Sequence, residues 1–166
     1  MTHHYKLAAA ALTLLSLTSL VGADQVSTPL NVTASLRGNC LVEAQSLDFP
    51  EYTPGAGDVH SESTIAVRCS KGTAYSVTLD EGVHGTSAEA RRMTNGAESL
   101  AYQLYLDAAR TTVWGDGVNG SAVSGEGKGM AQPILNKVYG RLPDTDENRD
   151  SPEGEYSDVI TVTVTF

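Results

Sequence analysis

The chain has 166 residues, and its 20 acidic side chains outnumber its 11 basic ones to give a net charge of −9 at pH 7. This balance argues against a nucleic-acid-binding protein, because affinity for phosphates comes from clustered lysine and arginine. It suits a soluble extracellular surface but identifies no fold or partner, and the length is sufficient for one domain with a hydrophobic core.

The first 23 residues have the pattern of a secretory signal. Lys6 precedes an apolar run over residues 7–20, and small residues occupy positions 21–23. A charged start, a short apolar middle and a small-residue end are typical of a signal peptide. The alternative, a membrane anchor, would need a longer apolar run. We therefore expect a mature chain that begins at Asp24 and does not insert into a membrane.

Hydrophobic residues recur at every second position along several segments of the mature chain. This period of two predicts β-strands with one buried and one solvated face. Short strands separated by Gly- and Pro-rich turns predict an all-β, antiparallel sandwich in a single domain. The alternating segments are residues 30–37, 65–69, 75–79, 100–106 and 160–166. The turn signals are residues 54–57, 95–96, 115–117, 125–129 and 152–154.

Two further segments lack this alternation. Residues 87–92 have a pattern that would allow one helical turn. Residues 143–154 are acidic and contain few apolar side chains, so they predict an exposed loop.

Alternating strands are also predicted at both ends of the mature chain. The first lies in residues 24–37, here called the leader, and the last is Val159–Phe166, which contains no charge and no proline. Uncharged strand edges promote aggregation, and proteins normally prevent this. Either the two edges pair within one molecule or another polypeptide pairs with them.

Cys40 and Cys69 are the only cysteines. Export would place them in an oxidising compartment, where two cysteines are expected to form a disulfide. Closing a loop of this length stabilises a fold by roughly 3–4 kcal/mol on the chain-entropy model. A metal site is the poorer alternative, because His60 and His84 show no ligand spacing. We expect a Cys40–Cys69 disulfide and no cofactor.

Other motifs do not indicate a catalytic or metal site. The glycine-rich residues 125–129 lack the spacing of a phosphate-binding loop, and Lys128 is followed by glycine. No EF-hand pattern surrounds the aspartates at positions 116, 144, 146 and 150. No Gly-x-Ser-x-Gly motif occurs either, and we expect no enzymatic activity.

A set of sequence blocks extends over nearly all of the chain after residue 23. The most distinctive are a tyrosine-rich block at residues 100–110 and a Gly-x-Tyr-x-Asp motif at residues 154–158, which leads into the terminal strand. The other blocks are residues 38–42, 47–49 with Tyr52, 65–69, 71–75, 113–117 and 138–141. Together they resemble the spore coat protein U domain family, which is shared with subunits of archaic (Csu-type) chaperone–usher pili.

The resemblance implies an incomplete immunoglobulin-like Greek-key β-sandwich that lacks its seventh strand and exposes a hydrophobic groove. In such pili a periplasmic chaperone fills the groove first. At the outer-membrane usher, the N-terminal extension of the next subunit replaces the chaperone. This donor-strand complementation is a form of β-strand addition. The implied partners are the chaperone, the usher and neighbouring pilus subunits, and the implied location is the cell surface, with roles in adhesion and biofilm formation.

The same resemblance divides the chain into a signal peptide at residues 1–23, a donor-strand extension at residues 24–37 and a sandwich domain at residues 38–166. The donor side chains would be Leu30, Val32, Ala34 and Leu36. Burying the three larger ones would contribute roughly 5–9 kcal/mol before entropy costs. A slip of one residue would place polar side chains in every pocket, so the register should be tightly specified.

The groove edge, where chaperone and donor compete, would be formed by the terminal strand. Its groove-lining side chains would be Ile160, Val162, Val164 and Phe166. The alternative for both the leader and this strand is ordinary pairing within one molecule.

The sequence thus favours a structural pilus subunit, with one domain and a donor-like leader that suit the shaft or a linker position better than the tip. A secreted spore-coat or cell-surface layer protein is the first alternative. A secreted carbohydrate-binding module is the second, in which Trp114 and the tyrosines Tyr102 and Tyr105 would stack on sugars. As strand residues, these aromatics more often lie in a core.

Overall fold

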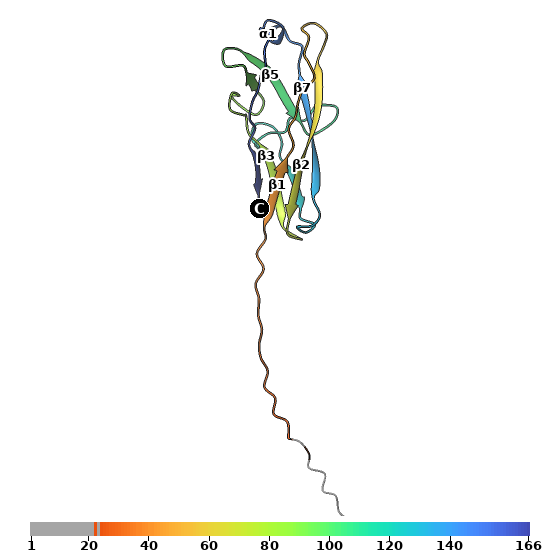
Figure 1. The fold of residues 1–166 in the computed structure, drawn as a ribbon, viewed down its shortest axis with the longest axis vertical. Helices are drawn as coiled ribbons and strands as arrows, with labels where there is room; N and C mark the ends of the chain where they lie inside the picture. Colours follow the sequence, from red (N-terminus) through yellow and green to blue (C-terminus); the bar gives the residue numbers. More distant parts are fainter. Residues whose placement is uncertain (1–21, 23) are drawn as a thin grey trace, which may run out of the picture. The chain divides into compact units, whose positions relative to one another are not determined.

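The computed structural model describes residue 22 and residues 24–166. The predicted signal peptide therefore lies outside the described residues, except for position 22. The chain divides into an N-terminal unit that ends at Ser35 and a β-rich body, Leu36–Phe166 (Figure 1).

The body contains two antiparallel sheets and one short helix, α1 (Asp146–Arg149). The five-stranded sheet has the order β1-β2-β7-β5-β4, and the three-stranded sheet has the order β6-β3-β8. The two sheets share one hydrophobic core, which confirms the predicted β-sandwich. The strands are β1 (Cys40–Ala44), β2 (Val59–Cys69), β3 (Ala74–Leu79), β4 (Arg91–Thr94), β5 (Ser99–Tyr105), β6 (Val123–Glu126), β7 (Ile134–Leu142) and β8 (Val162–Thr165).

The period-two pattern of the sequence corresponds to burial on one face of each central strand. On β2, Ile65, Val67 and Cys69 are buried, and the intervening residues are partly exposed. On β3 the buried positions are Tyr75, Val77 and Leu79. Both strands are in the interior of their sheets, so one face of each contributes to the core. Each large apolar side chain buried there stabilises the fold by about 1.5–3 kcal/mol.

The aromatic side chains considered for sugar stacking are core residues. Trp114 is 0% exposed, and its indole N–H donates to the carbonyl of Val77 at 3.1 Å. Tyr102 and Tyr105 on β5 are also buried. A buried ring needs a partner for its polar atom, and Val77 supplies it for Trp114. None of the three rings is available to a sugar at the surface.

The predicted disulfide is confirmed. Cys40 and Cys69 are bonded and are directly opposite each other in the β1–β2 register, with their Cα atoms 4.1 Å apart. Cys69 is fully buried. The bond therefore fixes the beginning of β1 to the end of β2, at one pole of the sandwich.

Several segments differ from the sequence-based expectation. Residues 24–39 contain no helix or strand, although residues 30–37 alternate as a strand would. Residues 87–90 do form a turn, in which the Ala90 N–H donates to the Ser87 carbonyl at 2.9 Å. Arg91 then begins β4 instead of continuing a helix. Within the predicted loop at 143–154, Thr145 caps α1 by accepting a hydrogen bond from the Asn148 N–H at 3.3 Å.

Candidate functional site

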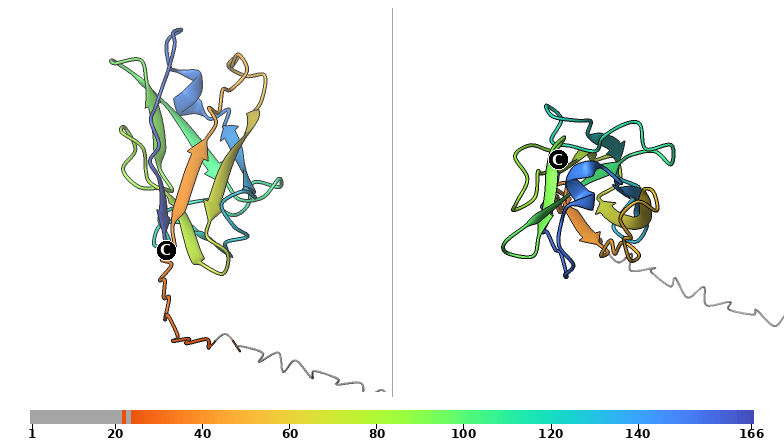
Figure 2. Two further views of the ribbon diagram at one scale, coloured as in Figure 1. Left: turned by 60° about the horizontal axis from the view of Figure 1, so that its bottom comes forward. Right: turned by 90° about the horizontal axis from the view of Figure 1, so that it is seen from above.

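The body has two sheet edges that run side by side. β1 is the outermost strand of one sheet and β8 of the other. Within the described residues, each pairs with a single strand, β2 or β3. The other edge of each strand is a row of backbone groups without a strand partner. Figures 1 and 2 show β1 and the C-terminal segment lying next to each other.

The two edges run in opposite directions from a common pole. The Ser70 N–H donates to the Asn39 carbonyl at 2.9 Å, so β1 begins beside the turn that connects β2 and β3. Thr165 is opposite Ser76 near the beginning of β3, so β8 ends beside the same turn. The turn therefore marks one end of the space between β1 and β8, here called the disulfide end.

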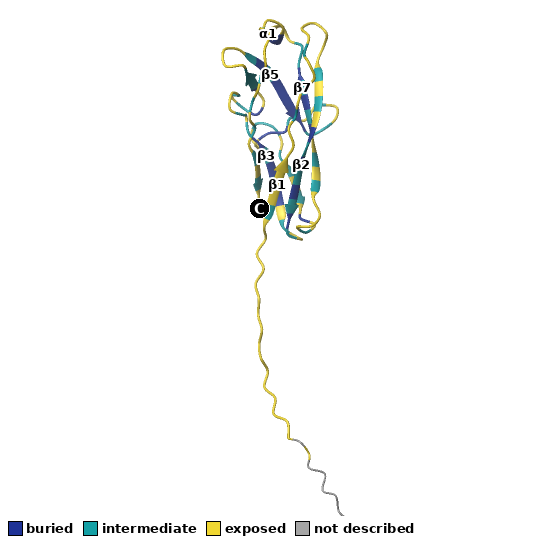
Figure 3. Cartoon of the chain, in the orientation of Figure 1, coloured by how far each residue is buried: buried dark blue, intermediate teal, exposed yellow. Residues whose placement is uncertain are grey.

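A groove of about 670 Å³ opens between these edges, towards the opposite end. Its walls are residues 44–49, which continue from the end of β1, and residues 155–160 with Val162, which lead into the start of β8. Its floor consists of core side chains from both sheets, including Ile65, Leu79 and Leu104. The floor strand β5 is drawn mostly as buried in Figure 3. An apolar floor between two unpaired edges is a suitable binding site for an extended polypeptide.

The wall that leads into β8 begins beside β4 of the five-stranded sheet and ends beside β3 of the three-stranded sheet. Ser157 exchanges two backbone hydrogen bonds with Thr94 at the end of β4, at 2.9 and 3.0 Å. Four residues later, the Thr161 N–H donates to the Asp80 carboxylate at 2.8 Å, and the Asp80 N–H donates to the Thr161 carbonyl at 3.2 Å. The wall is thus held at both ends before β8 begins.

Between these points, Asp158 ties the wall to the floor. The Tyr102 hydroxyl donates to the Asp158 carboxylate at 2.6 Å, and the Val83 N–H donates to its other oxygen at 3.0 Å. Gly82 adopts a φ of +82°, and a Cβ there would be 2.0 Å from this carboxylate. Only glycine allows the chain to approach Asp158 so closely.

The predicted groove-edge residues lie along this wall. Ile160 and Val162 line the groove, and Ile160, Val162 and Val164 all pack against the core. Phe166 is mostly exposed and is not part of the groove lining. The structure therefore brings the first two together at the groove and places the last beyond the end of β8. Their role as an acceptor edge stays a prediction.

The opposite wall was not identified from the sequence. Leu47 and Phe49 line the groove and pack against the core. They lie over Gly140 of β7, where an added Cβ would be 2.9 Å from each side chain. A glycine within a strand often marks such a close approach, and Gly140 is the sequence signal for this wall.

The predicted donor side chains are exposed. Leu30, Val32 and Leu36 are 87%, 83% and 94% exposed, and Ala34 is also exposed. The whole leader is drawn in the exposed colour in Figure 3. A run of large apolar side chains left in water is unfavourable. The role of these residues as a donor strand stays a prediction.

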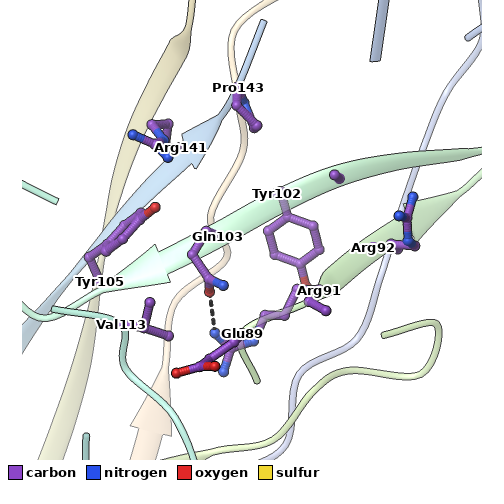
Figure 4. Close-up of a pocket in the computed structure, with 11 residues that line it drawn as sticks. Glu89, Arg91, Arg92, Tyr102, Gln103, Tyr105, Val113, Arg141 and Pro143 are labelled. Carbon is purple, nitrogen blue, oxygen red and sulfur yellow. Dashed lines mark hydrogen bonds between the residues drawn. The ribbon is translucent and has the colours of Figure 1, made fainter. Parts of the chain in front are cut away.

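A second, smaller cavity of about 280 Å³ lies beside β4 and β5 (Figure 4). Its lining includes Arg91, which is 1% exposed. The Arg91 guanidinium donates to Gln103 Oε1 at 2.7 Å and to the carbonyls of Asp80 (2.7 and 2.9 Å), Trp114 (2.8 Å) and Leu79 (3.3 Å). Burial lowers the pKa of Arg91, but an arginine stays protonated in proteins. Its donors are directed at protein acceptors, so it fixes the surrounding segments together.

Over residue 22 and residues 24–166, no three His, Cys, Asp or Glu side chains are grouped so that they could hold a metal ion. In that range, no helix has the length and apolar character needed to cross a membrane.

Comparisons with known proteins give consistent results. A model of the Spore Coat Protein U domain matches residues 26–163. Protein U of Myxococcus xanthus is 30% identical over 154 aligned positions, and the match covers 82% of this chain and 83% of that protein. The fold is similar to that of a chain in the crystal structure of the CsuC–CsuE chaperone–tip adhesion subunit pre-assembly complex, from archaic chaperone–usher Csu pili of Acinetobacter baumannii. That match has a TM-score of 0.54 and 24% identity, and covers 78% of this chain and 40% of the other.

Proposed function

The chain belongs to the spore coat protein U domain family, and we propose that it is a structural subunit of a secreted surface fibre of the archaic chaperone–usher type. The subunits polymerise by donor-strand complementation. The family is one of structural proteins, so the contribution of the chain is an assembly contact and not a catalysed reaction.

The observation that carries this proposal is the open groove between β1 and β8. Within the described residues, both strands have an unpaired edge, and the floor between them is apolar. Exposed strand edges and apolar surface favour association with another strand. A strand inserted along β8 would pair with its free edge and place alternate side chains on Ile65, Leu79 and Leu104.

The strand that fills the groove would be the leader of another subunit. Its apolar side chains occur at every second position from Leu30 to Leu36 and are exposed. Seven residues in an extended conformation span about 20 Å, a length comparable with the wall from Glu155 to Val162. The intervening residues are polar and would face water. Main-chain hydrogen bonds to β8 would add about 1 kcal/mol each.

The chaperone and the next subunit would occupy the groove one after the other. A periplasmic chaperone occupies the groove first and an outer-membrane usher catalyses the exchange for the leader of the next subunit. The structural match is to a chain from a chaperone–subunit pre-assembly complex of Acinetobacter baumannii, which supports a chaperone as the first partner. Residues 1–23 would direct export into the periplasm, residues 24–37 would be the donor and residues 38–166 the acceptor domain.

Expression of residues 24–166 alone tests the proposal. We expect the protein to aggregate or oligomerise without a chaperone, and to be recovered as a one-to-one complex when a cognate chaperone is co-expressed. Size-exclusion chromatography with light scattering distinguishes these states. A monodisperse, stable monomer in the absence of any partner would overturn the proposal.

A spore-coat or cell-surface layer protein is the second candidate, favoured by the description of the family and by the relative from Myxococcus xanthus. The same groove and leader would then join subunits into a limited assembly within a surface layer instead of a fibre. Immunogold electron microscopy separates the two, because a fibre subunit would label thin filaments and a coat protein would label a continuous surface. Neighbouring chaperone and usher genes would favour the fibre. The carbohydrate-binding alternative loses its basis, since Trp114, Tyr102 and Tyr105 are buried.

A further inference from the structure

The groove has charged side chains at one end only. Asp48 and Glu155 line it at the end away from the disulfide, and both are exposed. Neither carboxylate takes part in an ion pair within the described residues. The third lining carboxylate, Asp158, already accepts hydrogen bonds from Tyr102 and Val83. No lysine, arginine or histidine lines the groove.

The direction of the two walls places these carboxylates at the same end of the groove. Residues 44–49 continue β1 away from the disulfide end, and the Ser61 hydroxyl, far from Cys69 on β2, donates to the Asp48 carbonyl at 2.6 Å. The other wall approaches β8 from the same distant end, beginning at Glu155. Asp48 and Glu155 therefore lie on opposite walls at one end of the groove, here called the acidic end.

The leader has a complementary charge at one position. Between residues 25 and 37, Arg37 is the only ionisable side chain, and it follows directly after Leu36. A leader that pairs antiparallel with β8 would run from the disulfide end to the acidic end. If it follows the wall from Val162 back to Glu155, its final apolar residue would then lie near Tyr156, and Arg37 would emerge between the two walls beside Glu155. A leader in the reverse direction would place Arg37 at the disulfide end.

The disulfide end offers no comparable attraction. The turn beside it carries Lys71, and the Gly127 carbonyl accepts from the Gly72 N–H at 2.9 Å, which places Lys128 close by. The carboxylate of Glu126 is at the same end, where Glu126 pairs with Ala74. The disulfide end therefore has no excess of negative charge, whereas the charged side chains that line the groove at the acidic end are all carboxylates.

We propose that Arg37 of one subunit forms an ion pair with Asp48 and Glu155 of the next, and that this pair fixes the direction and register of the inserted leader. This inference rests on the proposed function, because it requires a leader in the groove. The apolar side chains at alternate positions exclude a one-residue slip but allow a two-residue slip. A charge at the end of the leader distinguishes these registers, since a shift of two residues moves Arg37 by about 7 Å.

Charge-swapped variants of the mature chain test the inference. Arg37→Glu replaces attraction by repulsion at a partly solvated site and should slow assembly roughly five- to tenfold at low salt. Arg37→Lys keeps the charge and should assemble at nearly the wild-type rate. The triple variant Arg37→Glu, Asp48→Lys and Glu155→Lys should recover most of the lost rate. The readout is the growth of ladders on gels of unboiled samples after release from the chaperone.

Salt dependence and a matched control complete the design. At 0.5 M NaCl, where exposed charges are strongly screened, Arg37→Glu and wild type should assemble at similar rates. Lys137→Glu alters an exposed cation of β7 that does not line the groove and should have little effect at any salt concentration. The inference is overturned if Arg37→Glu assembles as wild type at low salt, or if Lys137→Glu slows assembly equally.

The outcomes for the two proposals are distinguishable. If a charge within the apolar part of the leader (Val32→Asp) does not prevent assembly, the proposed function fails and the role of Arg37 fails with it. If Val32→Asp blocks assembly but Arg37→Glu does not slow it, donor-strand complementation stands and only the charge pairing is wrong.

Discussion

The hydroxyl of Tyr102 donates a hydrogen bond of 2.6 Å to the carboxylate of Asp158, and this contact joins the floor of the groove to its wall. Tyr102 is on β5 in the five-stranded sheet, whereas Asp158 precedes β8 of the three-stranded sheet. Burial, and then the bond to Asp158, raises the pKa of Tyr102, so the hydroxyl stays protonated and can donate. The two sheets are thus connected beside the open groove.

Tyr102→Phe should therefore destabilise the assembled protein and loosen the groove wall. Leaving a buried acceptor without its partner typically costs about 1–3 kcal/mol, and Asp158 would retain only the Val83 N–H. We expect a lower unfolding temperature of the fibres by calorimetry. Tyr139→Phe is the control, because the Tyr139 ring lies on the outer face between Lys137 and Arg110 and its hydroxyl makes no hydrogen bond in the described residues. Equal stability of wild type and Tyr102→Phe would contradict this prediction.

The far pole of the sandwich is fastened by a second carboxylate, that of Asp144. Its side chain is nearly buried and accepts from the Arg149 guanidinium, the Tyr52 hydroxyl at 2.7 Å and the N–H groups of Gly55 and Gly57, both at 3.0 Å. These hydrogen bonds, above all those from Arg149 and Tyr52, hold the pKa of Asp144 well below its usual range. The loop before β2 is thereby attached to α1.

This arrangement predicts a specific loss of stability in acid. A carboxylate whose pKa is depressed on folding stabilises the protein above its ordinary pKa near 3.8, and that contribution is lost as the pH falls below this value. Asp144→Asn should lower the unfolding temperature at pH 7 and weaken its pH dependence below pH 4. Asp150→Asn, at an exposed carboxylate without a side-chain partner in the described residues, should do neither. A wild-type profile that is flat from pH 5 to pH 2 would contradict the prediction.

The period-two pattern predicted β3, β5 and the second half of β2 because burial follows directly from alternation, but it did not predict the central strand β7. It did not predict β4, which begins Arg91-Arg92. Arg91 is buried only because main-chain carbonyls of Leu79, Asp80 and Trp114 converge on it, and no local pattern contains that information. Charged residues are rarely buried without such partners, so a polar strand is easily missed.

The groove was predictable from one side only. Ile160 and Val162 alternate within an uncharged strand, so their orientation follows from the sequence. The opposite wall depends on Leu47 and Phe49 lying over Gly140 of a distant strand, a tertiary contact that alternation does not encode. The acidic end was not predictable for the same reason. Asp48 and Glu155 are far apart in sequence, and only the fold brings both to the lining of the groove.

The disulfide should matter to the groove as well as to overall stability. Cys40→Ser with Cys69→Ser removes a closed loop with a sequence separation of 29 residues, and should cost roughly 3–4 kcal/mol. Because β1 pairs only with β2 in the described body, this groove wall would be the first to detach. We expect reduced chaperone binding in addition to a lower unfolding temperature. A double variant that binds the chaperone with wild-type affinity would show that the bond does not maintain the wall.

Val32→Asp addresses the donor directly, because Val32 is in the middle of the alternating leader and is 83% exposed. If it enters an apolar groove in the next subunit, an unpaired carboxylate there is strongly unfavourable, and no ladder should form. Chaperone binding should be intact, since the groove of the mutated subunit itself is unchanged. Thr33→Asp is the matched control: its side chain would face water in the same strand, so assembly should continue. Val164→Asp alters a core-packed residue of β8 and should impair both chaperone binding and assembly. Ladders from Val32→Asp as long as those of wild type would show that the leader is not the donor.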